Sequence, residues 1–277
     1  MKNKIAFLGA GNMAHALING LLADGFSATN ILASDPDSEK LNYLSSTKGI
    51  NACPTNKEAV AQAGVVVLAV KPQILKSLCE DIREEVINKC PLIISIAAGI
   101  PCIALKDWLD EETPIVRTMP NTPASINCGA TGLYATPNVS QEQKNTSESL
   151  MRAVGLTAWV TKEAHLDIVT ALSGSGPAYY FLMMEAMENA ASKLGLPQET
   201  AHILCLQTAF GAAKMALESD DNPALLRQRV TSPGGTTEKA IDTFKQGHFL
   251  ELVDSAISAA NKRSQELAQQ FGGKNNG

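Results

Sequence analysis

Two glycines separated by one residue follow the first apolar run of the chain and open an amphipathic segment. The run covers residues 4–8 and is followed directly by Gly9-Ala10-Gly11-Asn12-Met13-Ala14. In this context the first glycine permits a tight turn, the second lets the backbone approach a pyrophosphate, and the small Ala14 lets the helix pack on the strand. The amides at the helix start then bind the anion. The pattern predicts a dinucleotide-binding unit, and an ordinary glycine turn between strand and helix is the alternative.

The first 160 residues alternate short apolar runs with amphipathic segments, as parallel strands joined by crossover helices do. Several runs are apolar nearly throughout, which is typical of strands covered on both faces. The expected strands are 4–8, 30–34, 65–70, 92–96 and 115–119, and the expected helices are 13–22, 39–46, 57–63, 73–86 and 103–109. We therefore expect an α/β fold whose N-terminal Rossmann domain, residues 1–160, contains a doubly wound parallel sheet.

After Trp159 the strand pattern ends, and long helical periodicities follow in residues 161–277. The expected helices are 163–172, 178–194, 201–218, 239–245 and 251–268. Several of them carry Ala, Leu and Met with few charges on more than one side, so they need a partner on more than one face. We expect an all-α dimerisation domain, with residues 272–277 as a loose tail.

The composition restricts the kind of partner. Of the 277 residues, 45% are apolar and 18% are charged, a balance that suits a chain with a large buried core. The net charge of -5 and the lack of a Lys/Arg cluster argue against nucleic acid and membrane surfaces, which leaves a small molecule. No apolar stretch approaches the ~18 residues that span a bilayer, and the chain start reads as a strand rather than a signal peptide. We expect a cytoplasmic protein.

The cysteines and histidines predict no metal site. None of the six cysteines forms a CxxC pair, and the four histidines lack the spacing of metal ligands. The cysteines are expected to be reduced structural thiols.

An acidic residue follows the second expected strand, in Ser34-Asp35-Pro36-Asp37. The Asp35 carboxylate can accept hydrogen bonds from both adenosine ribose hydroxyls and would repel a 2'-phosphate, and no Arg lies in this turn to pair with one. This favours NADH slightly over NADPH. Two alternatives stay open: Asp35 only caps the next helix, or Ser34 with Lys40 tolerates NADPH.

Five further segments, taken in order, resemble the signature segments of pyrroline-5-carboxylate reductases, and the resemblance covers nearly the whole chain. They are Leu68-Ala-Val-Lys-Pro-Gln73, Ser95-Ile-Ala-Ala-Gly99, Arg117-Thr-Met-Pro-Asn-Thr-Pro123, Ala171-Leu-Ser-Gly-Ser-Gly-Pro-Ala-Tyr179 and Thr231-Ser-Pro-Gly-Gly-Thr-Thr237. The resemblance implies reduction of 1-pyrroline-5-carboxylate to L-proline by NADPH or NADH, the last step of proline biosynthesis. It also implies a homo-oligomer built from dimers, in which the helical domain of a second subunit meets the cofactor.

Carried over by position, the resemblance implies three sets of site residues. The cofactor would be bound by Leu8, Gly9, Ala10, Gly11, Asn12, Met13, Ser34, Asp35, Asn56, Ala69, Val70, Lys71, Pro72 and Ala97. The substrate would be bound by Met119, Pro120, Asn121, Ser173, Gly174, Ser175, Gly176, Ser232, Gly234, Gly235 and Thr236. The hydroxyl of Thr237 would bind the ring nitrogen and is the catalytic candidate.

The segment 232–238 reads as the start of a helix. We expect the amides of Gly235, Thr236 and Thr237 to lack intrahelical partners and to form a nest for the substrate carboxylate. A plain capped helix start is the alternative.

Three other functions were weighed against this one. The 2-hydroxyacid dehydrogenases of similar domain order resemble one another in a lysine one helical turn ahead of an asparagine, yet residues 177–192 contain Asn189 and no lysine. A reductase that uses a deazaflavin shares only the first glycine pattern. A non-enzymatic NAD(P)-binding sensor is also possible because fold does not fix function.

Overall fold

The computed structural model describes residues 4–272, and the expected tail beyond residue 272 lies outside this range. The described chain contains one sheet with the strand order β3-β2-β1-β4-β5-β6-β7-β8. The strands are β1 Ile5–Leu8, β2 Ile31–Ser34, β3 Asn51–Ala52, β4 Val65–Leu68, β5 Leu92–Ser95, β6 Ile115–Met119, β7 Gly129–Ala135 and β8 Gly155–Trp159. The first six strands run parallel, β7 runs antiparallel to β6, and β8 runs parallel to β7. This confirms the doubly wound sheet.

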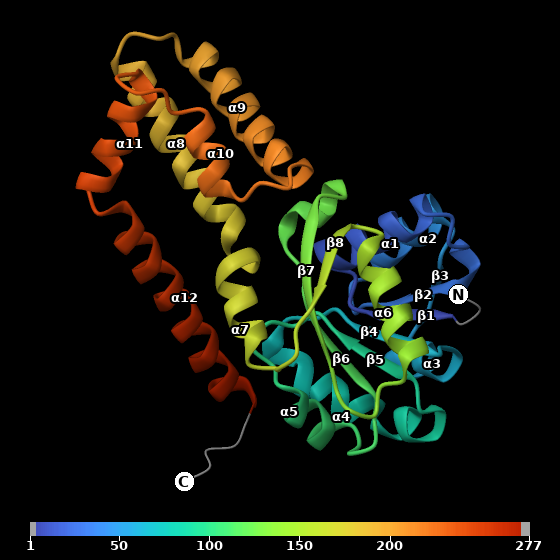
Figure 1. Cartoon of the computed structure of the whole chain (residues 1–277). Helices are drawn as coiled ribbons and strands as arrows, with labels where there is room; N and C mark the ends of the chain where they lie inside the picture. The colour runs from blue at the N-terminus through green and yellow to red at the C-terminus, as the bar shows by residue number, and fades with distance from the viewer. Residues whose placement is uncertain (1–3, 273–277) are drawn as a thin grey trace. The chain divides into compact units, whose positions relative to one another are not determined.

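Helices cover both faces of this sheet (Figure 1). Alternate residues of β1 point to opposite sides, so Ile5 and Phe7 belong to one apolar cluster while Ala6 and Leu8 belong to the other. The first cluster includes residues of α1 Asn12–Ala23, α2 Ser38–Lys48 and α6 Gln141–Arg152. The second includes residues of α3 Asn56–Gln62, α4 Pro72–Lys89 and α5 Cys102–Trp108. Burial on both faces explains why the central strands are apolar throughout.

The strand order reverses between β1 and β4, which lie side by side at the centre of the sheet. Leu8 pairs with Ser34 on one side and with Leu68 on the other, so the carboxyl ends of these strands align at one edge. Ser95 at the end of β5 pairs with Leu68 and continues this edge. Sheets of this kind bind ligands outside the carboxyl ends of their strands, at the point where the order reverses.

The C-terminal part of the described chain is helical, as expected. It contains α7 His165–Val169, a π-helical turn Thr170–Gly174, α8 Gly176–Lys193, α9 Gln198–Glu218, α10 Pro223–Arg229, α11 Thr236–Gln246 and α12 Phe249–Gly272. The backbone forms two compact units: the first contains the residues up to Ser175 and those from Ala259 onward, and the second is Gly176–Ser258. Within the first unit, the Ser264 hydroxyl on α12 donates to Asp167 of α7 at 2.7 Å. The domain boundary expected near residue 160 stays a prediction.

Three strands and one α-helix within residues 4–160 were not expected from the sequence: β3, β7, β8 and α6. Strand β7 lacks a long apolar run because it needs small residues, since a Cβ added at Gly132 would lie 2.7 Å from Val169. In α6 only Ser147, Leu150 and Met151 are buried, so the helix has few apolar residues from which to predict it. Among residues 4–272, no helix has the length and apolar character needed to cross a membrane.

Candidate active site

The glycine turn after β1 has the geometry that its pattern predicts. Gly9 has a φ of 101°, and a Cβ there would lie 2.6 Å from the carbonyl oxygen of Ala69. Only glycine fits both the conformation and the space. Gly11 caps α1 without a side-chain hydrogen bond to the helix, and a Cβ added at Gly11 would meet no atom within 4 Å. The first amides of α1 lack intrahelical partners, and the space beside Gly11 is open, which fits a bound pyrophosphate.

The carboxylate of Asp35 joins the glycine turn to the end of β2. Its Oδ2 accepts from the amide of Ala10 at 2.7 Å, and its Oδ1 accepts from the amide of Asp37 at 2.9 Å. The helix cap is Asp37, which accepts from the amides of Glu39 and Lys40. The alternative that Asp35 caps α2 is therefore wrong, because the N-cap of α2 is Asp37, two residues later.

Lys40 is already paired in this structure. Its ammonium group lies 3.1 Å from the Asp37 carboxylate, on the exposed first turn of α2. The hydrogen bond from Lys40 lowers the pKa of Asp37, and the same contact raises the pKa of Lys40. For Lys40 to bind a 2'-phosphate, it would have to exchange this carboxylate for the phosphate.

The other expected cofactor residues follow carboxyl ends of the same sheet. Asn56 begins α3, and buried Ala97 comes just after β5. The amide of Ala69 donates to Leu8 at 2.8 Å and holds the turn after β4 beside the glycine turn. Exposed Lys71 caps α4 through its backbone, with Pro72 as the first helical residue. The structure thus gathers Leu8, Gly9, Ala10, Gly11, Asn12, Met13, Ser34, Asp35, Asn56, Ala69, Val70, Lys71, Pro72 and Ala97 at one sheet edge.

Two expected substrate segments, residues 119–121 and residues 173–174, lie side by side in the first unit.

The side-chain amide of Asn121 donates to the carbonyl of Ser173 at 3.0 Å and accepts from the amide of Ala130 at 2.9 Å. A Cβ added at Gly174 would lie 2.5 Å from the terminal methyl of Met119. Met119 and Asn121 are thus in contact with the π-helical turn that precedes Ser175, and Pro120 lies between them in the chain. Gly176 begins the second unit.

The remaining expected substrate residues lie in the second unit, in the turn before α11. Gly234 has a φ of 72°, and the amide of Gly235 donates to the carbonyl of Ser232 at 3.0 Å. The amide of Gly234 donates to the Glu238 carboxylate at 2.7 Å.

The Gly235 amide thus has no partner within α11, as expected, but it is engaged outside the helix, because Ser232 to Gly235 close a β-turn with glycine at its third position. Thr236 and Thr237 open α11, where amides lack intrahelical partners. Both residues are exposed. The structure places Ser232, Gly234, Gly235, Thr236 and Thr237 in this one turn, and their roles stay predictions.

A buried ion pair beneath this sheet edge was not singled out by the sequence. Arg117 of β6, 8% exposed, donates to Glu163 Oε1 at 2.5 Å, and the same oxygen accepts from the amide of Cys102 at 2.6 Å. Burial raises the pKa of the Cys102 thiol, with the Glu163 carboxylate adding to the effect. The only signal in the sequence was a charged residue in the middle of a short strand that is mostly apolar.

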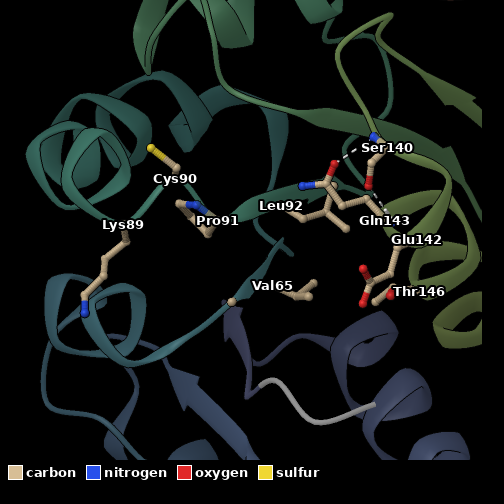
Figure 2. Close-up of a pocket in the computed structure, with 10 residues that line it drawn as sticks. Val65, Lys89, Cys90, Pro91, Leu92, Ser140, Glu142, Gln143 and Thr146 are labelled. Atoms are coloured by element: carbon tan, nitrogen blue, oxygen red, sulfur yellow. Dashed lines mark hydrogen bonds between the residues drawn. The ribbon is translucent and has the colours of Figure 1, made fainter.

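A hollow of about 460 Å³ lies at the opposite edge of the sheet, beside the amino ends of β4 and β5. Figure 2 shows Lys89 and Glu142 on opposite sides of it. The Ser140 and Gln143 side chains there are engaged in the capping box of α6. This hollow is remote from the carboxyl-end crevice and does not belong to the candidate site. In the described residues, no group of three or more His, Cys, Asp or Glu side chains could hold a metal ion.

Comparisons with known proteins show the family to which the chain belongs. A family model for pyrroline-5-carboxylate reductase dimerisation matches residues 163–267, and one for NADP oxidoreductase, coenzyme F420-dependent, matches residues 4–99. A pyrroline-5-carboxylate reductase of Pseudomonas aeruginosa is 53% identical over 269 residues, which cover 97% of this chain and 98% of that protein. The chain belongs to the pyrroline-5-carboxylate reductase family.

Solved structures place this reductase in the same family. A pyrroline-5-carboxylate reductase from Coxiella burnetii shares 45% identity at a TM-score of 0.94, covering 97% of this chain and 100% of that one. The Plasmodium falciparum pyrroline carboxylate reductase, solved with NADP bound, shares 29% identity at a TM-score of 0.85, covering 97% and 99%. The model of coenzyme F420-dependent oxidoreductases covers only the Rossmann part of the reductase, as expected of a shared nucleotide-binding unit.

Proposed function

We propose that this chain reduces 1-pyrroline-5-carboxylate to L-proline by hydride transfer from NADPH or NADH, as the last step of proline biosynthesis. The observation that carries the proposal is the 53% identity to a pyrroline-5-carboxylate reductase across 97% of the chain. The identity spans both the glycine turn after β1 and the turn before α11, the two helix starts at which anions would bind.

The cofactor would be held mainly by backbone groups at the sheet edge. The open space over Gly11 and the uncapped start of α1 fit the pyrophosphate, and Asp35 lies at the end of β2 where the ribose is expected. The bound nicotinamide supplies the hydride. The NADP-bound Plasmodium falciparum relative supports use of NADPH, while the negative charge of Asp35 favours NADH.

The substrate would be held by its carboxylate and its ring nitrogen. The amides of Thr236 and Thr237 at the start of α11 offer hydrogen-bond donors and the positive end of the helix dipole to a carboxylate. The Thr237 hydroxyl would then fix the ring nitrogen. Because an imine is readily protonated in water, the protein need not supply a strong acid, and its contribution is positioning and electrostatic stabilisation.

The proposed assembly is a homo-oligomer built from dimers. The matched dimerisation domain supports it, and so does the stripe of Ile203, Leu206 and Phe210 on α9, whose side chains are 59%, 41% and 61% exposed. An apolar surface of this kind is typical of an interface. A cytoplasmic location is also proposed, supported by six cysteines that all remain free thiols.

The 2-hydroxyacid dehydrogenase alternative would need a lysine near Asn189 to remove the alcohol proton. Helix α8 carries its first lysine at Lys193, after Asn189 rather than one turn ahead of it. If the chain were a non-enzymatic sensor, its sequence identity with reductases over both domains would have no functional explanation.

A kinetic assay tests the proposal. The absorbance of NADPH or NADH is followed after addition of 1-pyrroline-5-carboxylate, and in parallel a 2-hydroxyacid is offered with NADP or NAD. We expect turnover with the imine only. Failure of the imine to oxidise either cofactor would favour the sensor.

The same assay tests the role of Thr237. Thr237→Ala should lower kcat by about tenfold to a thousandfold, the usual loss for one oriented polar contact to the reacting group. Thr243→Ala is the matched control, since this exposed threonine lies on the same helix and its hydroxyl donates back to the Lys239 carbonyl. Full activity of Thr237→Ala would rule out the assignment.

A further inference from the structure

The side chain of Asn121 is engaged by the protein at both of its ends. Oδ1 accepts from the amide of Ala130 on β7 at 2.9 Å, and Nδ2 donates to the carbonyl of Ser173 at 3.0 Å. A side-chain amide that binds two backbone groups is fixed in orientation and has only one lone pair and one N–H left. This arrangement fits a brace between segments better than a group that rearranges around a ligand.

The bond to Ser173 satisfies a carbonyl for which α-helical geometry offers no donor. In an α-helix, the carbonyl of residue 173 would accept from the amide of residue 177, but this is Pro177, which has no N–H. A carbonyl withdrawn from water without a partner is costly, so a donor from outside the helix stabilises the conformation of this part-buried group. Asn121 supplies that donor.

The braced segment is a single π-helical turn. The amide of Ser175 donates to the carbonyl of Thr170 at 2.8 Å, and the hydroxyls of Thr170 and Ser173 bond back to carbonyls one turn earlier. Isolated π-helical turns occur mainly at functional sites, where they shift the side chains that follow. Gly174 lies directly against Met119, so the turn is in contact with the end of β6 at a second point.

We infer that Asn121 is a positioning residue for the imine substrate: it holds the π-helical turn Thr170–Gly174 in register with the carboxyl end of β6 and so sets the conformation of Ser173 to Ser175. The inference rests on the proposed function, in which Ser173 to Gly176 bind the substrate. Asn121 acts through the backbone of this turn, and the glycine turn that binds the cofactor is untouched by it.

The variant Asn121→Asp tests the hydrogen bond from Asn121 to Ser173 separately from the one that Asn121 accepts from Ala130. The carboxylate keeps an acceptor for the Ala130 amide but presents an oxygen instead of an N–H to the Ser173 carbonyl. The KM for 1-pyrroline-5-carboxylate should rise about tenfold, as for one lost hydrogen bond, while the Kd for NADPH stays within twofold of wild type. Amide exchange at Ser175 should be faster, because its bond to Thr170 belongs to the turn that is released. Asn121→Ala, which adds no charge, should shift the same quantities in the same direction.

Asn138→Asp is the matched control. Asn138 is also engaged at both ends, since it donates to the Glu112 carbonyl at 2.7 Å and accepts from the Thr136 hydroxyl at 2.7 Å. It lies after β7, away from the braced turn, so its substitution should leave both constants and the Ser175 exchange rate unchanged.

The inference is overturned if Asn121→Asp keeps the wild-type KM for the imine, or if the imine KM and the NADPH Kd rise together with a loss of thermal stability, as a merely structural role would predict. If the wild-type protein does not reduce the imine, the proposed function fails. The rate of amide exchange at Ser175 then decides by itself whether Asn121 holds the π-helical turn in place. Faster Ser175 exchange in Asn121→Asp than in Asn138→Asp supports it, and equal exchange overturns it.

Discussion

At the scale of single residues, the two glycines of the first turn carry different constraints. Gly9 is constrained by the protein, because its φ of 101° and the Ala69 carbonyl 2.6 Å from an added Cβ exclude any side chain. Gly11 is not, since its φ is -78° and no atom lies within 4 Å of an added Cβ. The fold therefore does not require glycine at position 11, and we propose that the space over Gly11 is kept open for the cofactor.

Alanine substitutions should separate these two constraints. Gly9→Ala should lower the free energy of unfolding by about 2 kcal/mol or more, through backbone strain and the clash with Ala69. Gly11→Ala should leave the melting temperature unchanged and raise the Kd for NADPH about tenfold or more, since its methyl group enters the pyrophosphate site. Thermal unfolding and fluorescence titration measure the two effects. Tight NADPH binding by Gly11→Ala would contradict the placement of the pyrophosphate.

The charge of Asp35 should set the cofactor preference. Asp35→Ser removes a negative charge from the end of β2 and should shift the ratio of kcat/KM for NADPH over NADH upward by about tenfold. Asp37→Ser is the control, because it removes the same charge two residues later from an exposed helix cap. If the ratio of kcat/KM for NADPH over NADH is unchanged in Asp35→Ser, the charge of Asp35 does not set the cofactor preference. Its role would then be the hydrogen bonds that it accepts from Ala10 and Asp37.

At the scale of elements, the sequence predicted the central strands and the helices beside them because each is strongly patterned. The strands at one end of the sheet escaped prediction because tertiary packing decides them: β7 carries Gly132 against Val169, and β8 pairs with β7 along its length. The glycine turn was predictable because consecutive residues determine its conformation. The contact of Asn121 with Ser173 was not, because it joins segments 52 residues apart.

The Arg117–Glu163 pair links β6, α5 and the segment before α7, and its loss should destabilise the first unit. Glu163→Ala leaves the Arg117 charge, 8% exposed, and the Cys102 amide without their acceptor, and should lower the free energy of unfolding by about 2 kcal/mol. The expected loss is below that of a fully buried pair because the Glu163 side chain is 27% exposed. Glu163→Gln should cost less, since its amide oxygen still accepts.

Glu266→Ala provides the comparison for this experiment. Glu266 pairs with Arg263 at 2.9 Å on exposed helix surface, where an ion pair contributes about 0.5 kcal/mol at most. Urea denaturation of the variants measures the difference. Equal stability of the Glu163 and Glu266 variants would contradict a structural role for the buried pair.

At the scale of the whole molecule, the helical domain leaves apolar side chains exposed that a second copy would cover. Scattering mass measurements should give at least twice the 29.3 kDa of one chain. Phe210→Glu places a charge in the exposed stripe of α9 and should shift the mass toward one chain, with loss of activity. Ile74→Glu on α4, where the side chain is 51% exposed, should leave the mass unchanged. A wild-type protein that runs as a single chain would contradict the proposed assembly.

The central claim is that this chain moves a hydride from a reduced nicotinamide to the imine carbon of 1-pyrroline-5-carboxylate. The most direct measurement uses NADPH carrying deuterium at both C4 positions and locates the label in the product by NMR. The account predicts L-proline with one deuterium at C5. Proline without the label, or no proline while the cofactor is consumed, would contradict it.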